Sequence, residues 1–402
     1  MKIIEGGVCA AKGFKAGAMR CGIRKSQTKK DLAMILSDCE CNAAAVYTTN
    51  RVKAAPILLT KEHLANGKAR AVIVNSGNAN ACAPFGMENA RREAAAAARA
   101  LGVEAEDVIV ASTGVIGQTL NVEAIEEHAG SMEMKYDNSM AAAEAIMTTD
   151  TKVKTIAVEF EAGGTVCHMG GICKGSGMIH PNMGTMLAFI TTDCAITAEQ
   201  MQKALLDEAR ITFNRVTVDG DTSTNDMCAL LSNGMAGNAE IAAEGADYTA
   251  FREALHVITE DLARKIAGDG EGASKLMTCS VSGAADEETA ERLAKSICSS
   301  SLVKAAMFGS DANWGRVLCA MGYSGAPFDT EAVTVEFASK EGCVAVCEQG
   351  RGLDFDEDLA KRILSQEEVE IRVTLKEGGG AVTCWGCDLT YDYVKINGDY
   401  RS

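Results

Sequence analysis

Hydrophobic and polar positions follow two different patterns along this chain, and both are typical of β-strands. Thr155–Glu161 and Ala332–Phe337 alternate apolar with polar residues, which predicts strands with one buried face. Thr185–Thr191 is apolar throughout except at its ends, so this segment is predicted to be a central strand buried on both faces. Shorter apolar runs predict further strands at Ala71–Asn75, Asp107–Ala111 and Val369–Leu375.

Segments with helical periodicity separate these strands. Thr197 and Gln200 form a capping box at the start of one predicted helix, and glycines follow the ends of two others. The four predicted helices are Glu88–Leu101, Ala198–Arg210, Thr249–Ala267 and Glu287–Ser299. Helices and strands are mixed throughout, which indicates the α/β or α+β class. The segment most typical of a domain boundary is SGAADE at residues 282–287. It predicts that the chain is divided into two domains, residues 1–283 and 284–402.

The charge and the apolar runs of the chain bear on its partners. The net charge is −16 over 402 residues, and the basic residues form only short pairs such as Arg24-Lys25 and Lys29-Lys30. Binding to phosphate groups requires clustered Lys and Arg, so neither nucleic acid nor an anionic membrane is expected as a partner. Residues 1–22 lack a signal-peptide core, and no run approaches the ~20 apolar residues of a membrane span. We therefore expect a cytoplasmic protein.

Sixteen cysteines in a chain without a secretion signal are expected to be reduced thiols. Most lie within apolar runs, where Cys behaves as a small hydrophobic residue. One alternative is a zinc site made of Cys343, Cys347, Cys384 and Cys387, because the CWGC spacing suits a pair of ligands. Against it, VAVC alternates like a strand, and CWGC leads directly into DLTYDYV. We expect no metal.

The Gly184-Thr185 bond joins a glycine-rich loop to the predicted central strand. A Thr hydroxyl is a weak nucleophile, but a free α-amine on the same residue can accept its proton. Cleavage before Thr185 would therefore create a nucleophile and its base in one residue, and Gly184 permits the backbone strain that such a cleavage needs. The alternative is that Thr185 only begins a buried strand, since β-branched residues favour strands. The five histidines are scattered, which gives a Ser-His-Asp triad little support.

The surrounding motifs resemble one family, the glutamate N-acetyltransferases, also called ornithine acetyltransferases, of arginine biosynthesis. Each motif alone is weak, but eight in order over nearly the whole chain are specific. They are NSGNANAC (75–82), STGVIG (112–117), MTTDT (147–151), KGSGMI (174–179), NRVTVDGDTSTND (214–226), GDGEGASK (268–275), GSDANWGR (309–316) and WGCDLTYDYVKIN (385–397). The family usually has Ala where this chain has Gly184, and often Thr where it has Ser402.

The resemblance implies a layered α/β/β/α sandwich, similar to the N-terminal-nucleophile hydrolases but wound differently, followed by a smaller C-terminal α/β domain. It implies self-cleavage between Gly184 and Thr185 and an acetyl-enzyme on Thr185. Its oxyanion donors would be Thr113 and Gly114, where STGVIG alone would be an ordinary turn after a strand. The substrate contacts would be Thr148, Lys174, Thr185, Glu271, Asn397 and Ser402. Without the resemblance, Lys174 would be interpreted as a surface lysine and Glu271 as a loop carboxylate.

The implied activity is transfer of an acetyl group from N-acetylornithine to glutamate in two steps through Thr185. The resemblance implies no cofactor and allows acetyl-CoA as a second acetyl donor. It also implies a heterotetramer of two 1–184 and two 185–402 chains.

Three alternatives stay open at this point. In an amidase or aminopeptidase of the same fold, water would be the acceptor. The acidic run Asp219, Asp221 and Ser223 resembles an aspartyl-phosphatase motif, although such a motif normally lies near the start of a chain; the simpler interpretation is a polar turn. An uncleaved, inactive scaffold is the third.

Overall fold

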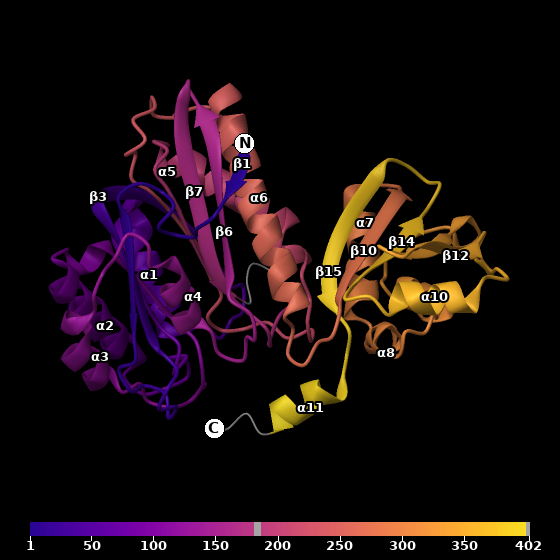
Figure 1. The fold of residues 1–402 in the computed structure, drawn as a ribbon, viewed down its shortest axis with the longest axis horizontal. Helices are drawn as coiled ribbons and strands as arrows, with labels where there is room; N and C mark the ends of the chain where they lie inside the picture. The colour runs from indigo at the N-terminus through magenta and orange to yellow at the C-terminus, as the bar shows by residue number, and fades with distance from the viewer. Residues whose placement is uncertain (181–185, 399–402) are drawn as a thin grey trace.

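The computed structural model describes residues 1–180 and 186–398, and in this part of the chain it contains two β-sheets (Figure 1). The first sheet has nine strands, in the order β1-β6-β7-β8-β9-β3-β4-β5, with β2 paired to β3. Strand β3 joins the two halves of this sheet: its first part pairs with β2 and β4 and its last part with β9. The strands are β1 (Lys2–Ile4), β2 (Phe14–Met19), β3 (Leu32–Tyr47), β4 (Lys68–Asn75), β5 (Val108–Ser112), β6 (Lys154–Ala162), β7 (Thr165–Lys174), β8 (Leu187–Thr192) and β9 (Met227–Ser232).

Alternate residues of these strands belong to different hydrophobic cores, and this explains the layers. Leu187 and Phe189 of β8 share one central core with Val72 and Val74 of β4, so the two halves of the sheet face each other. Ala188 and Ile190 face the opposite way, into an outer core. Period-two alternation in strands buried on both faces thus produces two β layers packed together. One helix, α4 (Ser139–Ile146), also contributes to the central core.

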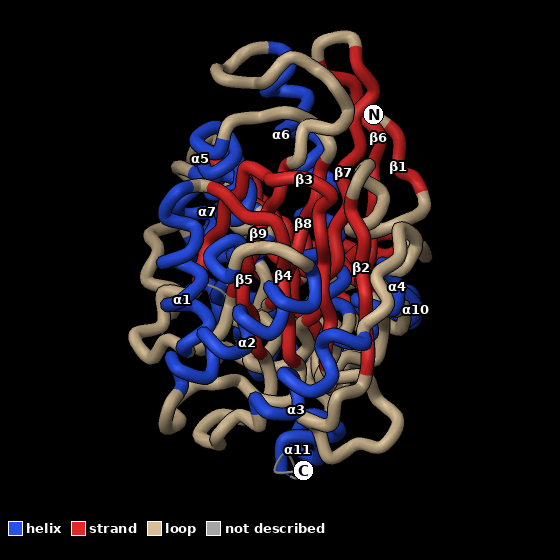
Figure 2. Tube along the Cα trace, turned by 90° about the vertical axis from the view of Figure 1, so that its left-hand side faces the viewer, coloured by secondary structure: helices blue, strands red, loops and turns tan. Residues whose placement is uncertain are grey.

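Helices cover both outer faces of this double layer. On one side α5 (Ala198–Ile211) and α6 (Ala246–Gly268) bury Leu205 and Phe251 against β6–β9. On the other side α1 (Ala55–His63), α2 (Gly86–Leu101) and α3 (Val122–His128) pack on β4 and β5, in front of the strands in Figure 2. The result is the expected α/β/β/α sandwich, and the predicted fold class is confirmed.

The second sheet has six strands within the described residues, in the order β13-β12-β11-β14-β10-β15. Its apolar face is covered by helices, whereas its other face carries polar residues such as Thr278, Ser280 and Arg372. The expected division after residue 283 falls at the end of β10, a strand of this second sheet. The elements are β10 (Leu276–Ala284), α7 (Glu287–Ser299), α8 (Ser301–Gly309), α9 (Trp314–Gly322), β11 (Thr334–Ser339), β12 (Gly342–Glu348), β13 (Arg351–Gly352), α10 (Glu357–Leu364), β14 (Glu368–Thr374), β15 (Gly380–Cys387) and α11 (Tyr391–Gly398).

The strands and helices predicted from periodicity are confirmed, with ends in the described residues that coincide or shift by up to three residues. The Thr197 hydroxyl accepts a hydrogen bond from the Gln200 amide, as the capping box predicts. Gly268 is the last residue of α6 and not the residue that follows it. The final helix, α11, leaves the second sheet after β15 and lies beneath the first domain in Figure 1.

Candidate active site

A cavity of about 630 Å³ lies at the ends of β5 and β7 and at the start of β8, and α11 contributes to its wall. The structure brings six of the sequence-predicted site residues to this one cavity from separate parts of the chain: Thr113, Gly114, Thr148, Lys174, Glu271 and Asn397. Gly184, Thr185 and Ser402 lie outside the described residues. Met186, the residue that follows Thr185 in the sequence, lines the cavity.

The loop that carries Thr113 and Gly114 continues from β5 and runs beside the loop that follows β4. The Thr113 amide donates to the Asn75 carbonyl at 2.9 Å, and Val115 bridges to Asn78. Gly114 has φ +133°, and a Cβ there would lie 2.7 Å from the Asn78 nitrogen, so this position requires glycine. Among the described residues, neither the Gly114 amide nor the Thr113 hydroxyl has a hydrogen-bond partner.

The side chain of Asn75 is the centre of a buried hydrogen-bond network beside this loop. The Asn75 side-chain amide donates to Ser112 Oγ at 2.7 Å and to Glu93 Oε1 at 3.3 Å. Glu93 lies on α2 and is fully buried, and burial raises its pKa to about 8 although Asn75 opposes the shift. Sequence analysis missed Glu93. The sequence feature that could have indicated its burial is its position directly before the alanine run Ala94–Ala98 of an amphipathic helix.

Lys174 is the last residue of β7, and it is not at the surface: the residue is 7% exposed. Its ammonium lies 3.9 Å from Asp150 Oδ2, which is too long for a hydrogen bond. Burial lowers the pKa of Lys174, and the Asp150 carboxylate opposes that shift. Within the described residues Lys174 makes no hydrogen bond through its side chain, so its three donors are available to a ligand in the cavity.

Asp150, Lys154 and Asp269 form a buried charge cluster behind the cavity wall. Lys154 Nζ lies 2.7 Å from Asp150 and 2.5 Å from Asp269, and all three side chains are at most 3% exposed. Asp150 also accepts hydrogen bonds from the amides of Thr148 and Gly175. Burial alone would raise the pKa of Asp150, but Lys174 and Lys154 lower it below its ordinary value.

This charge cluster fixes the backbone next to three predicted substrate contacts: Thr148, Lys174 and Glu271. Sequence analysis missed it, although Asp150 and Lys154 lie four residues apart beside the MTTDT motif.

Glu271 and Asn397 meet at the side of the cavity where α11 lies. The Asn397 side-chain amide donates to Glu271 Oε2 at 2.7 Å and to the Tyr393 carbonyl. The Glu271 amide donates to the Ser176 carbonyl at 2.8 Å. A Cβ at Gly177 would lie 2.3 Å from the Glu271 carboxylate, so the absence of a side chain there makes room for Glu271. A residue near the end of the chain thereby completes a site built by the first domain.

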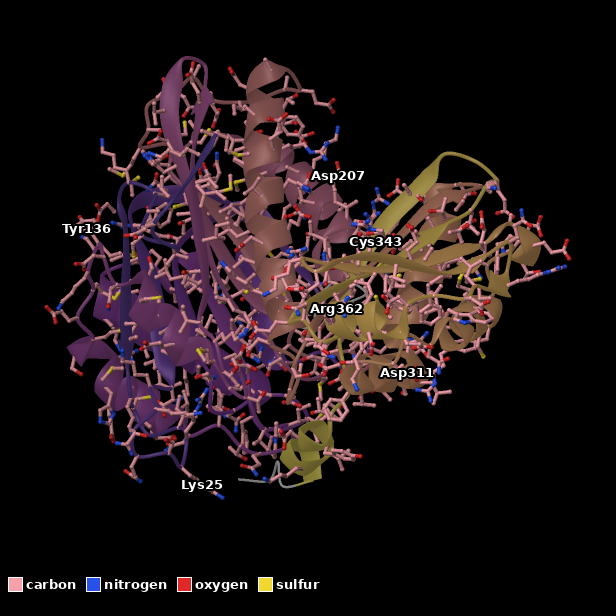
Figure 3. The ribbon with its side chains drawn as sticks, turned by 45° about the vertical axis from the view of Figure 1, so that its right-hand side comes forward. Lys25, Tyr136, Asp207, Asp311, Cys343 and Arg362 are labelled. Atoms are coloured by element: carbon pink, nitrogen blue, oxygen red, sulfur yellow. The ribbon has the colours of Figure 1, made fainter. Side chains whose placement is uncertain are left out.

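The four cysteines of the zinc alternative do not meet. Cys343 and Cys347 lie on β12, whereas Cys384 and Cys387 lie on β15, and three strands separate these two in the sheet. Cys384 packs in the core of the second domain and Cys387 in that of the first, while Cys343 is exposed on the second domain (Figure 3). The described residues contain no group of three or more His, Cys, Asp or Glu side chains that could hold a metal.

The acidic run at residues 219–223 belongs to a polar turn. The Asp219 carboxylate accepts the backbone amides of Met178, Ile179 and Asp221. Only the Asp221 contact is local, as the simpler interpretation of this motif predicted; the other two amides lie about 40 residues earlier in the chain, and the Tyr393 hydroxyl donates to Oδ2 as well.

A search of the described part of the chain found no helix that is both long and apolar enough to cross a membrane.

The fold is that of an α/β enzyme, and its candidate active site is the cavity at the strand ends of the double β layer. Residues 15–402 match the model of the ArgJ family, and this chain belongs to that family. It is 47% identical to the arginine biosynthesis bifunctional protein ArgJ of Caldanaerobacter subterraneus over 405 residues, which covers 100% of both chains. It is 49% identical to ArgJ 1 of Clostridium acetobutylicum, which covers 97% of this chain and 96% of that protein.

One solved structure adds a comparison in three dimensions. The crystal structure of an arginine biosynthesis bifunctional protein argJ from Bacillus halodurans is 45% identical, with a TM-score of 0.51. The match covers 53% of this chain and 99% of that one.

Proposed function

We propose that this chain is a self-processing glutamate N-acetyltransferase of arginine biosynthesis, which moves an acetyl group from N-acetylornithine to glutamate through Thr185. The observation that carries the proposal is the convergence of Thr113, Gly114, Lys174, Glu271 and Asn397 on a cavity lined by Met186, the residue that follows Thr185 in the sequence. These residues span almost 300 positions of sequence, and a merely structural role for each would not collect them in one place.

Self-cleavage begins when the Thr185 hydroxyl oxygen attacks the Gly184 carbonyl carbon. The peptide C–N bond breaks, an ester links Gly184 to the Thr185 oxygen, and the α-amine of Thr185 becomes free. Water then hydrolyses the ester and leaves a carboxylate on Gly184. Residues 185–402 make up 218 of 402 residues, or 54% of the chain. The solved Bacillus halodurans chain, almost all of which aligns, matches 53% of this chain, and this supports two separate products.

Acetyl transfer uses the same oxygen. The Thr185 α-amine accepts the hydroxyl proton while the oxygen attacks the acetyl carbonyl of N-acetylornithine, and the proton then passes to the departing ornithine amine. The amine of glutamate next attacks the acetyl-Thr185 ester and regenerates the hydroxyl. Each attack places negative charge on a carbonyl oxygen, and the unpartnered donors of Gly114 and Thr113 suit that charge. Such donors contribute about 3–4 kcal/mol each.

The cavity contains charges of both signs, which suits two substrates whose side chains differ in charge. Both N-acetylornithine and glutamate carry an α-carboxylate, and the Lys174 ammonium has donors available for an anionic group. Glu271, held by Asn397, can attract the ammonium of ornithine. Acetyl-CoA as a second donor, the absence of a cofactor, the heterotetramer of two 1–184 and two 185–402 chains and a cytoplasmic location complete the proposal.

The test combines intact mass with an acceptor assay. Scaling 42.2 kDa by 184/402 and 218/402 gives fragments of about 19 and about 23 kDa. The purified protein should show both, and ornithine release from N-acetylornithine should depend on glutamate. Thr185→Ala should remain a single chain and lose transfer. An intact 42.2 kDa protein with full activity would exclude the free-amine mechanism. Equal release of acetate with and without glutamate would favour the amidase alternative.

A further inference from the structure

The turn at Thr217–Thr222 holds the three residues that immediately precede the undescribed segment 181–185. Asp219 accepts the Met178 amide at 2.6 Å through Oδ2 and the Ile179 amide at 2.9 Å through Oδ1. The Val218 amide donates to the Ile179 carbonyl at 2.6 Å, and the Thr222 hydroxyl donates to the His180 carbonyl at 2.8 Å. Three consecutive residues are thus fixed through their backbone.

A fifth contact and a backbone conformation strengthen this picture. His180 Nδ1 lies 3.0 Å from Thr217 Oγ1, so the side chain of the last described residue before the gap is also held. Met178 has φ +57°, in the left-handed region that a residue with a side chain rarely adopts. A carboxylate that accepts two successive amides can stabilise such a turn, because these hydrogen bonds are charge-assisted.

The other end of the segment is anchored by the same stretch of chain. The Met227 amide donates to the Met186 carbonyl at 2.9 Å, and Leu187 begins the parallel pairing of β8 with β9. Residues 181–185 therefore connect two anchors, His180 and Met186, that both bind residues 217–227.

We propose that Asp219, together with Val218 and Thr222, is a positioning site for self-cleavage of the Gly184-Thr185 bond. This inference rests on the proposed function. Self-cleavage requires the Thr185 hydroxyl to approach the carbonyl of the residue before it, and orientation of this kind governs the rate of an intramolecular attack. The Asp219 carboxylate acts on this step through the backbone of residues 178 and 179. Three of its partners are backbone amides, and the fourth is the Tyr393 hydroxyl of α11, which donates to Asp219 Oδ2 at 3.3 Å. Tyr393→Phe removes only this fourth contact and should cleave at the wild-type rate.

The rate of self-cleavage after synthesis tests the proposal. Full-length protein is made by cell-free translation, synthesis is stopped, and the uncut fraction is followed by intact mass. Asp219→Ala removes both acceptors and should slow cleavage at least about tenfold, since a hydrogen bond to a charged group contributes enough for that factor. Asp219→Asn retains one acceptor oxygen and should be intermediate. Asp221→Ala is the matched control, because its exposed side chain makes no hydrogen bond or ion pair among the described residues, and it should cleave at the wild-type rate.

A purely structural role is separated by measuring stability in the uncleavable Thr185→Ala background. There, Asp219→Asn and Asp219→Ala should both remain folded at the assay temperature, so that the difference in their cleavage rates does not come from unfolding. If Asp219→Ala does not fold, Thr222→Val decides, since it removes only the hydroxyl that donates to His180 and should also slow cleavage. Wild-type cleavage rates in both Asp219→Ala and Thr222→Val would overturn the inference. A wild-type protein that never cleaves would instead refute the proposed function.

Discussion

The two sheets of this protein differ in what covers their faces. Every residue of β8 and β9 is buried, because helices cover one side of these strands and the second β layer covers the other. In β14 and β10 burial alternates, because α7 to α10 cover only one side and the opposite side is polar. The central strands β8 and β9 therefore have no face open to water, and the cavity lies at the strand ends of this sheet.

This difference determines how each region carries charge. Charges at the strand ends of the first sheet are removed from water and must be paired inside the protein, as Lys154 is with Asp150 and Asp269. On the open face of the second sheet, Arg372 pairs with Glu370, but both side chains remain partly exposed. The open face of the second sheet can therefore tolerate charge, whereas the buried central strands of the first sheet can tolerate it only where partners exist.

The largest difference in stability between the two sheets is expected when a carboxylate is introduced into each. Ala188 on β8 is fully buried, so Ala188→Asp introduces a charge without a partner and should cost about 5 kcal/mol or prevent folding. Ala381 on β15 is exposed, and Ala381→Asp should cost about 1 kcal/mol or less. Urea unfolding of both variants measures the difference. Equal losses would show that the open face is covered in the folded protein.

The next largest difference in the free energy of unfolding is expected when one cation is removed from each region. Lys154→Met removes the ammonium that pairs with both Asp150 and Asp269, leaving only Lys174 beside Asp150, and should lower the free energy of unfolding by about 3–5 kcal/mol. Arg372→Met removes one partner of a partly exposed pair and should cost less than about 1 kcal/mol. Chemical denaturation of both proteins at pH 7 compares them. A small loss for Lys154→Met would mean that water reaches the cluster.

The contributions of Glu93 and Glu370 to folding stability should change with pH in opposite directions. The pKa of Glu93 is raised to about 8 by burial, so folding stability falls as pH rises from about 4.5 toward 8. Glu93→Gln should therefore gain about 1–3 kcal/mol relative to wild type between pH 5 and pH 8.5. Although burial opposes it, Arg372 lowers the pKa of Glu370, which stabilises the fold above the unfolded pKa and is lost as pH falls.

Glu370→Gln should accordingly be less stable than wild type at neutral pH, by less than about 1 kcal/mol, and approach wild type in acid. Melting temperatures across this pH range decide both cases. A Glu93→Gln difference that does not change with pH would mean that Glu93 is ionised in the folded protein.

The smallest effect on stability is expected where the second domain meets the site. Helix α11 has no buried residues, so Asn397→Ala should change stability by less than about 0.5 kcal/mol. It removes the hydrogen bond to Glu271 and should raise the KM for substrate about tenfold, while self-cleavage proceeds normally. Steady-state kinetics and intact mass measure these outcomes. Unchanged kinetics would remove Asn397 from the predicted substrate contacts.

Elements with strong periodicity were predictable, and buried polar partners were not. The fully apolar run after Thr185 predicted a central strand, and β8 is buried on both faces as expected. Lys174, in contrast, looked like a surface lysine when considered alone, because the sequence does not record that Asp150 lies 3.9 Å away and that the cavity wall encloses both. Glu93 and Lys154 were missed for the same reason: each is stabilised by residues that meet it only after folding.

The sequence by itself determined the class of fold, the helices and strands, and the family, since periodicity and motif order are local properties of the chain. The tertiary structure decided which of the motif residues share one cavity, that α11 brings Asn397 to Glu271, and that the acidic run holds residues 178–180. The physical reason is that periodicity reports only whether a face is buried. The contact partners of a buried polar group depend on how strands distant in sequence are paired.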